Sequence, residues 1–126
     1  MQNEFITSNG AIVTITRGDS FEAVVFVNQG TLLVPVRYEV TGTDNLFLGI
    51  MEPNQLFENA IIRKVFNGNS KKTEDGDIII SLEPYETEHL HPGTYYYSIK
   101  LQQFDEDNNN KEYVTTIVPK TLLYIV

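Results

Sequence analysis

The stretch TYYYSIKLQQF, residues 94–104, decides the fold class, because its apolar and polar residues alternate one by one. An alternation of period two places successive side chains on opposite faces of an extended strand. The larger apolar residues share one face: Tyr95, Tyr97, Ile99 and Leu101. The other face has Tyr96, Ser98, Lys100 and Gln102. The stretch therefore predicts a strand that buries one face against a core.

The same alternation recurs along most of the chain and predicts further short strands. They cover residues 11–17, 20–28, 45–52, 59–66, 77–83, 112–118 and 121–126. Turn-forming residues separate them at positions 9–10, 29–30, 42–45, 67–76, 92–93 and 105–110. About eight strands at this spacing predict an all-β fold, an antiparallel immunoglobulin-like β-sandwich, with a barrel as the alternative. A helical turn is expected only within residues 84–90.

Length and composition restrict the classes of function. The chain has 126 residues without an evident linker, so we expect a single domain over residues 1–126. Cys is absent, which removes disulfides and thiolate chemistry and fits a reducing cytosol. A net charge of −8 disfavours nucleic-acid and anionic-membrane partners. We also expect neither a secretion signal nor a membrane span, because no apolar run approaches the roughly 20 residues that a bilayer requires.

One polar loop was tested against the calcium-binding pattern. Asp105, Asp107 and Asn109 have the first three spacings of a calcium loop. The pattern then needs Gly at its sixth position and Glu at its twelfth, where this chain has Asn110 and Thr116. We therefore expect a solvated hairpin loop and no metal there.

The remaining candidates for reactive groups are two histidines and three acids. His89 and His91 have no third ligand nearby, so surface positions are expected. Glu83, Glu86 and Glu88 could serve a glycosidase only if two of them faced each other across a cleft. A solvated turn explains them more simply. No nucleophile elbow or phosphate-binding loop is present, so we expect no enzyme and no cofactor.

A turn near the end of the chain has the form of a tyrosine corner. In immunoglobulin-like domains, a Tyr at the start of a late strand bonds back across the preceding turn. Pro92-Gly93-Thr94-Tyr95 has this local form, with Tyr95 as the corner residue. The alternative is that Tyr95 is an ordinary strand residue.

Two segments carry a resemblance to a known family. Residues 15–21, ITRGDSF, match the pattern I-x-R-G-D-[ST]-F. Residues 82–99 match an acidic L-x-P-x-[DE]-T-x-x-L turn followed by P-G-x-Y-x-Y-x-I. The chain thereby resembles small β-sandwich proteins of tailed bacteriophages, including the N-terminal domain of the upper baseplate protein. Residues 47–66 would supply the middle strands of that sandwich.

The resemblance implies a non-enzymatic structural protein of the bacteriophage virion, in a tail, a baseplate or a fibre attachment. Its partners would be other virion proteins, in a homo-oligomer or multi-copy assembly formed in the cytoplasm of the host bacterium. Upper baseplate proteins continue into long coiled or receptor-linked regions, whereas this chain ends at Val126. A capsid decoration or head-fibre anchoring protein therefore stays open. A glycan-binding adhesion module is a further alternative, although the chain has no Trp for sugar stacking.

The tripeptide Arg17-Gly18-Asp19 is also known as an integrin-binding motif. Here we expect a structural turn, in which Gly18 takes a positive φ and Asp19 with Ser20 satisfies backbone N–H groups at a bend. The structural turns predicted from the sequence thus comprise Arg17, Gly18, Asp19, Pro92, Gly93 and Tyr95.

The candidate interface lies within residues 38–57, where apolar residues stand beside loop residues. Its members are Leu46, Phe47, Leu56 and Phe57. Such residues could form the apolar anchors of a contact with another virion protein. The alternative is that they fill the core.

Overall fold

The computed structural model describes residues 5–6, 11–30 and 33–126. This part of the chain is mostly β-structure, with a single short α-helix, α1 (Pro84–Thr87). The strands are β1 (Phe5–Ile6), β2 (Val13–Ile15), β3 (Phe21–Val25), β4 (Asn28–Gly30), β5 (Pro35–Arg37), β6 (Asn45–Met51), β7 (Ile62–Asn67), β8 (Ile78–Leu82), β9 (Gly93–Asp105) and β10 (Lys111–Ile125). Two short 3-10 turns, η1 (Phe57–Asn59) and η2 (Glu106–Asn108), interrupt the connections.

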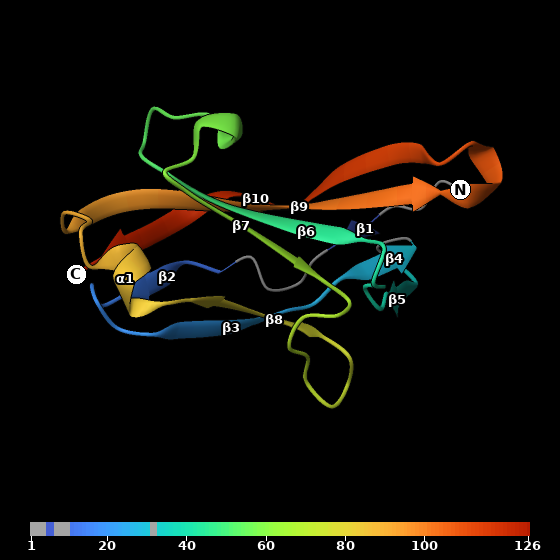
Figure 1. The fold of residues 1–126 in the computed structure, drawn as a ribbon, viewed down its shortest axis with the longest axis horizontal. Coiled ribbons are helices and arrows are strands. Elements are labelled where there is room, and N and C mark those ends of the chain that lie inside the picture. The colour runs from blue at the N-terminus through green and yellow to red at the C-terminus, as the bar shows by residue number, and fades with distance from the viewer. Residues whose placement is uncertain (1–4, 7–10, 31–32) are drawn as a thin grey trace.

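The main sheet has five strands in the order β2-β10-β9-β6-β7. Its centre is the long hairpin of β9 and β10, which pair antiparallel from Asp105 with Lys111 to Gly93 with Ile125. Strand β6 pairs antiparallel with both β9 and β7. Strand β2 pairs with β10 in parallel, so the sheet is mixed. The sheet curls into a half-barrel, visible as the upper layer of Figure 1.

A smaller layer lies opposite the curled sheet. Strands β3 and β8 form an antiparallel two-stranded sheet, from Phe21 paired with Leu82 to Val25 paired with Ile78. Figure 1 shows this pair below β2, β6 and β9, with α1 at one end of the molecule and β4 and β5 toward the other. Strands β4 and β5 belong to a third sheet, of order β1-β4-β5.

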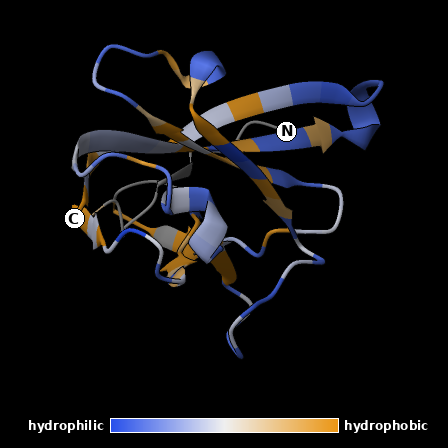
Figure 2. Cartoon of the chain, turned by 60° about the vertical axis from the view of Figure 1, so that its left-hand side comes forward, coloured by the Kyte–Doolittle hydropathy of each residue, from blue (hydrophilic) through white to orange (hydrophobic). Residues whose placement is uncertain are grey.

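The hydrophobic core lies between the main sheet and the β3–β8 pair. Strand β9 confirms the alternation expected from its sequence, because Tyr95, Tyr97, Ile99 and Leu101 are all buried. Strand β8 buries Ile78, Ile80 and Leu82 from the opposite side. Figure 2 shows hydrophobic residues on the strands of both layers, whereas the tip of the β9–β10 hairpin is hydrophilic.

The predicted antiparallel immunoglobulin-like sandwich is correct only in being mostly β-structure. The parallel pairing of β2 with β10 contradicts an all-antiparallel arrangement. Strand β10 also has register shifts between Thr116 and Val118 and between Val118 and Thr121. Such irregularities bend a strand and increase its twist, which accounts for the curl of the sheet.

Several element bounds differ from those expected. Residues 112–118 and 121–126 form one strand, β10, because pairing with β9 resumes beyond the irregularities. The turn expected at Gln29-Gly30 is part of β4, which pairs with β5. The strand expected at residues 59–66 begins at Ile62, after η1. The turn expected at Asn9-Gly10 lies outside the described residues.

Candidate functional site

The Arg-Gly-Asp tripeptide lies at the bend between β2 and β3. Gly18 has a φ of +82°, a left-handed conformation that favours glycine. The Gly18 N–H donates a hydrogen bond to Oγ1 of Thr87, at 3.0 Å. The neighbouring Arg17 N–H donates to the carbonyl oxygen of Val126, also at 3.0 Å. The bend therefore connects the end of β2 to α1 and to the C-terminal strand.

The role expected of Asp19 and Ser20 at this bend is wrong. Both side chains are exposed, and neither takes part in a hydrogen bond among the described residues. The Asp19 N–H donates to the carbonyl oxygen of Thr16 at 3.0 Å, within the bend itself. The acceptor for Gly18 comes instead from Thr87, 69 residues further along the chain.

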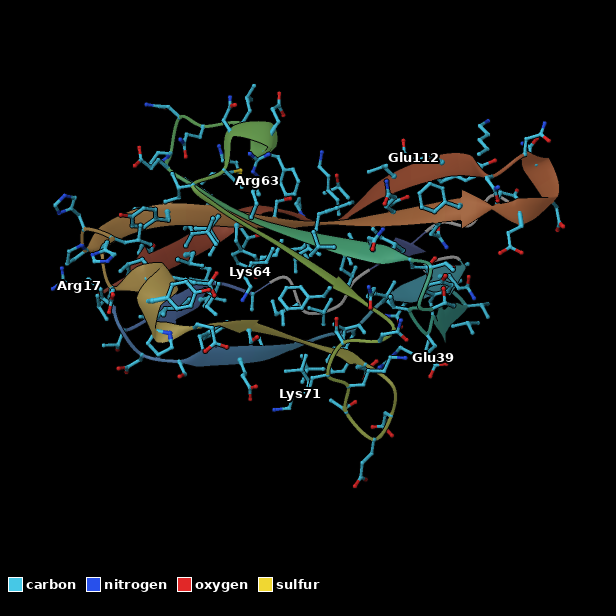
Figure 3. All side chains as sticks on the ribbon, in the orientation of Figure 1. Arg17, Glu39, Arg63, Lys64, Lys71 and Glu112 are labelled. Carbon is cyan, nitrogen blue, oxygen red and sulfur yellow. The ribbon has the colours of Figure 1, made fainter. Side chains whose placement is uncertain are left out.

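Helix α1 is short, and hydrogen bonds hold both of its ends in place. Thr87 is completely buried. The Glu86 carboxylate accepts hydrogen bonds from the Glu83 N–H and from Nζ of Lys64, each at 2.8 Å. Figure 3 shows Lys64 extending from β7 into the space between the layers, whereas Arg63 lies on the other side of the main sheet.

Lys64 makes a second contact that fixes its position. Its ammonium donates to the carbonyl oxygen of Ser81 on β8, at 2.7 Å. Lys64 therefore links β7, β8 and α1, with 21% of its side chain exposed and 12% of the Glu86 side chain exposed. Sequence reasoning missed this link, because a single Lys on an alternating strand gives no sign of its partner.

Tyr95 occupies the position expected of a corner residue. Its side chain is buried, and its hydroxyl donates to the carbonyl oxygen of His91 at 2.7 Å. The bond spans Pro92 and Gly93, where the chain turns into β9. A buried tyrosine hydroxyl without a partner would be costly, so this bond stabilises the turn.

The acids and histidines weighed for catalysis or metal binding lie around α1 and the turn before β9. Glu83 and Glu88 are exposed, and Glu88 lies 3.3 Å from Nε2 of the exposed His89. His91 is exposed at the turn before β9. Within residues 5–6, 11–30 and 33–126, no group of three or more His, Asp or Glu side chains is arranged to hold a metal ion.

The calcium-like segment forms the tip of the β9–β10 hairpin. The Asp105 carboxylate accepts a hydrogen bond from the Asp107 N–H at 3.0 Å, which begins the 3-10 turn η2. Asn109 and Asn110 both have a φ of +56°, a conformation that Asn tolerates better than most residues. The segment thus has the local geometry of a tight hairpin connection.

A buried polar cluster lies where β9 faces the loop before β6. The Tyr38 hydroxyl donates to the carboxylate of Asp44 and accepts from Nε2 of Gln103 at 3.1 Å. The Asp44 carboxylate also accepts from the Thr41 N–H at 3.0 Å. Burial, followed by the hydrogen bond to Asp44, raises the pKa of Tyr38 to about 12. The cluster is assigned a structural role, because its polar groups form hydrogen bonds with one another.

The outer face of the main sheet contains an apolar patch, which we call the outer patch: Phe47, Leu56, Phe57 and Val65. Phe47 and Val65 are directly opposite each other on β6 and β7. Phe57 covers Gly49, where an added Cβ would lie 2.7 Å from the Phe57 ring. Val65 is 57% exposed and Leu56 is 62% exposed. Phe47, Phe57 and Val65 line a shallow hollow beside Arg63.

The residues of the interface predicted from the sequence do not all lie on one surface of the structure. Leu46 is completely buried and packs in the core, so its assignment to an exposed interface is wrong. Phe47 and Phe57 are half-buried on the outer face, and Leu56 is exposed beside them. The Lys100 ammonium lies 4.8 Å from the centre of the Phe57 ring and adds a positive charge to the patch.

Among the described residues, no helix has the length and apolar character needed to cross a membrane. Comparisons of the chain with protein-family models, with curated proteins and with solved structures gave no match.

Proposed function

We propose that this protein is a non-enzymatic structural component of a bacteriophage virion, in the tail, the baseplate or a fibre attachment, and that it acts by docking onto other virion proteins. A capsid decoration or head-fibre anchoring role would use the same kind of contact. The proposal includes that the two layers are an irregular form of an immunoglobulin-like sandwich. It assigns no cofactor, no nucleic acid and no membrane to the protein.

The observation that carries the proposal is the hydrogen bond between Gly18 and Thr87. Gly18 belongs to the R-G-D segment, and Thr87 belongs to the acidic turn of the second segment that resembles phage β-sandwich proteins. The two segments meet in space although they are far apart in the chain. Because the two segments contact each other, a single scaffold would account for both of them. This favours one phage-type scaffold over two chance matches to the family pattern.

The reactive side chains in these segments are used to hold the scaffold. Glu86, one of the acids considered for hydrolysis, is bonded to Lys64 and to the start of α1. Tyr95 is bonded across its own turn. An activity based on positioning needs only a rigid body and a contact surface, and these contacts supply the rigidity.

The outer patch is the contact surface that we assign to docking. Phe47 and Val65 lie on adjacent β-strands and line one hollow with Phe57 of η1, while Leu56 directly precedes η1. Lys120 holds the loop that precedes η1 by donating to the carbonyl oxygens of Pro53 and Gln55, both at 3.2 Å. Arg63 and Lys100 bring two positive charges to the patch, and Glu58 brings one negative charge to the same hollow. A partner with an apolar centre and an acidic rim would complement this surface.

The test is the composition of purified particles. Phage particles from a producing culture of the host bacterium should contain peptides of this chain, at a fixed ratio to the major structural proteins, when analysed by mass spectrometry. A chain that is abundant in the lysate but absent from gradient-purified particles would refute the virion assignment.

The docking surface is tested by paired variants in the same culture. Val65→Asp should give a folded protein that is no longer incorporated, because it places a carboxylate among the apolar side chains that the partner would have to desolvate. Val36→Asp is the matched control, since Val36 is exposed to a similar degree (53%) but lies on β5 in another sheet. Equal incorporation of both variants would exclude the outer patch as the contact.

A further inference from the structure

A cavity of about 230 Å³ lies between the main sheet and the β3–β8 pair. Strands from both layers line it, including Val13 and Ile15 on β2, Ala23 on β3, Ile80 on β8 and Leu48 on β6. Protein interiors are normally close-packed and contain few voids larger than a water molecule. Here the space is partly open to solvent, because its wall includes the exposed Ala11 and the half-buried Phe21 and Ala23.

The chemistry of the cavity wall excludes charged or strongly polar occupants. Tyr97 has the only polar side chain among the described residues of the wall. Its hydroxyl is already used, because it donates to the carbonyl oxygen of Ala11 at 2.5 Å. Burial raises the pKa of Tyr97, which is consistent with poor solvation at this end of the cavity. A buried water needs two to four polar partners, which this wall does not offer.

The least buried residues of the cavity wall lie just before β2 and on β3. These strands follow each other in the chain but belong to different sheets. Figure 1 shows β2 just above β3, beside α1. The wall residues on this side are only partly buried or exposed, namely Ala11, Phe21 and Ala23.

We propose that this cavity is a binding site for one small uncharged molecule or apolar group, of the size of a substituted benzene ring or a short alkyl chain. A dry apolar cavity of about 150 Å³ is large enough to bind benzene or xenon. The present cavity is larger, so a ring with an alkyl substituent fits the space. This site is independent of the outer patch and of the proposed virion function.

The probe for the test is toluene, followed by methyl ¹H–¹³C spectra of the isotope-labelled full chain. Saturable shifts should appear at Val13, Ile15 and Ile80, and the thermal midpoint of unfolding should rise with toluene concentration. Methyl groups outside the cavity, such as those of Val36 on β5, should not shift. Xenon should perturb the same cavity methyl groups.

Ala23→Leu should fill part of the space and weaken toluene binding at least tenfold, while the chain stays folded. Val36→Leu is the matched control, because it enlarges an exposed side chain outside the cavity and should leave binding unchanged. If Ala23→Leu does not fold, Val13→Leu tests the same wall with a smaller added volume. Absence of shifts with both toluene and xenon, or equal binding by a folded filling variant and the wild type, would overturn the proposal.

Discussion

Replacing Thr87 with valine tests the contact between the bend at Gly18 and helix α1. Valine keeps the shape and volume of threonine but has no hydroxyl, so the Gly18 N–H loses its acceptor. Thr87 is 0% exposed, which prevents water from entering at the position of the lost hydroxyl without a rearrangement. The perturbation is therefore confined to one hydrogen bond and its surroundings.

The expected loss of stability follows from the cost of an unpaired donor. A buried polar group left without a partner costs about 1–3 kcal/mol. Gly18 is only half-buried, so partial hydration of its N–H lowers the expected cost of Thr87→Val to about 1–2 kcal/mol. At ~2.1 cal/mol/K of unfolding entropy per residue, this chain should show a fall of about 4–8 °C in its thermal midpoint.

Urea unfolding followed by circular dichroism and tyrosine fluorescence measures the effect, since the chain has seven Tyr and no Trp. The midpoint should fall while the slope of the transition stays constant. Two controls should remain within about 0.5 kcal/mol of the wild type, because their side chains are exposed and make no hydrogen bond among the described residues: Thr116→Val and Asp19→Ala. A Thr87→Val protein as stable as these controls would refute the assigned role of the hydroxyl.

Three further variants test other contacts. Burial and the Asp44 hydrogen bond raise the pKa of Tyr38 from 10.0 to about 12. The stability that this shift contributes is therefore complete below pH 10 and is lost as the pH rises through 12. Tyr38→Phe should flatten that part of the pH–stability curve, as measured by thermal midpoints between pH 9 and 12. Gly49→Ala should displace the Phe57 ring and cost about 1 kcal/mol in urea unfolding, because the new Cβ would lie 2.7 Å from that ring. Lys64→Met should cost about 1–2 kcal/mol in the same assay, since it removes a charged donor from a largely buried carboxylate.

The strand content could be predicted because alternation is a local signal. Strand β9 shows it most clearly, since every second residue from Tyr95 to Leu101 is apolar and buried. The face of β6 could not be predicted in this way, because NLFLGIM is apolar on both faces. A shift of one residue exchanges the two faces of a strand. For this reason Leu46 and Phe47 were grouped together in the sequence, whereas the structure places them on opposite sides.

The partners of the structural turns could be predicted only when they were close in the chain. The Tyr95 bond reaches back four residues, so the turn sequence itself suggests it. The acceptor for Gly18 is 69 residues away, and a single hydroxyl-to-backbone bond leaves no periodic pattern. Asp19 was the nearer candidate in the sequence, and the tertiary structure supplied Thr87 instead.

The cavity follows from the unequal size of the two layers. Strands β9 and β10 span 13 and 15 residues, whereas β3 and β8 span five residues each. A curled sheet encloses more space than a flat one, and two short strands cannot fill it completely with residues as small as Ala23. The register shifts of β10 lie opposite Tyr97 and Ile99, two residues of the cavity wall. Local sequence patterns cannot predict this difference in size between the layers. Each strand shows its own alternation of apolar and polar residues, and the space appears only when the two layers pack together.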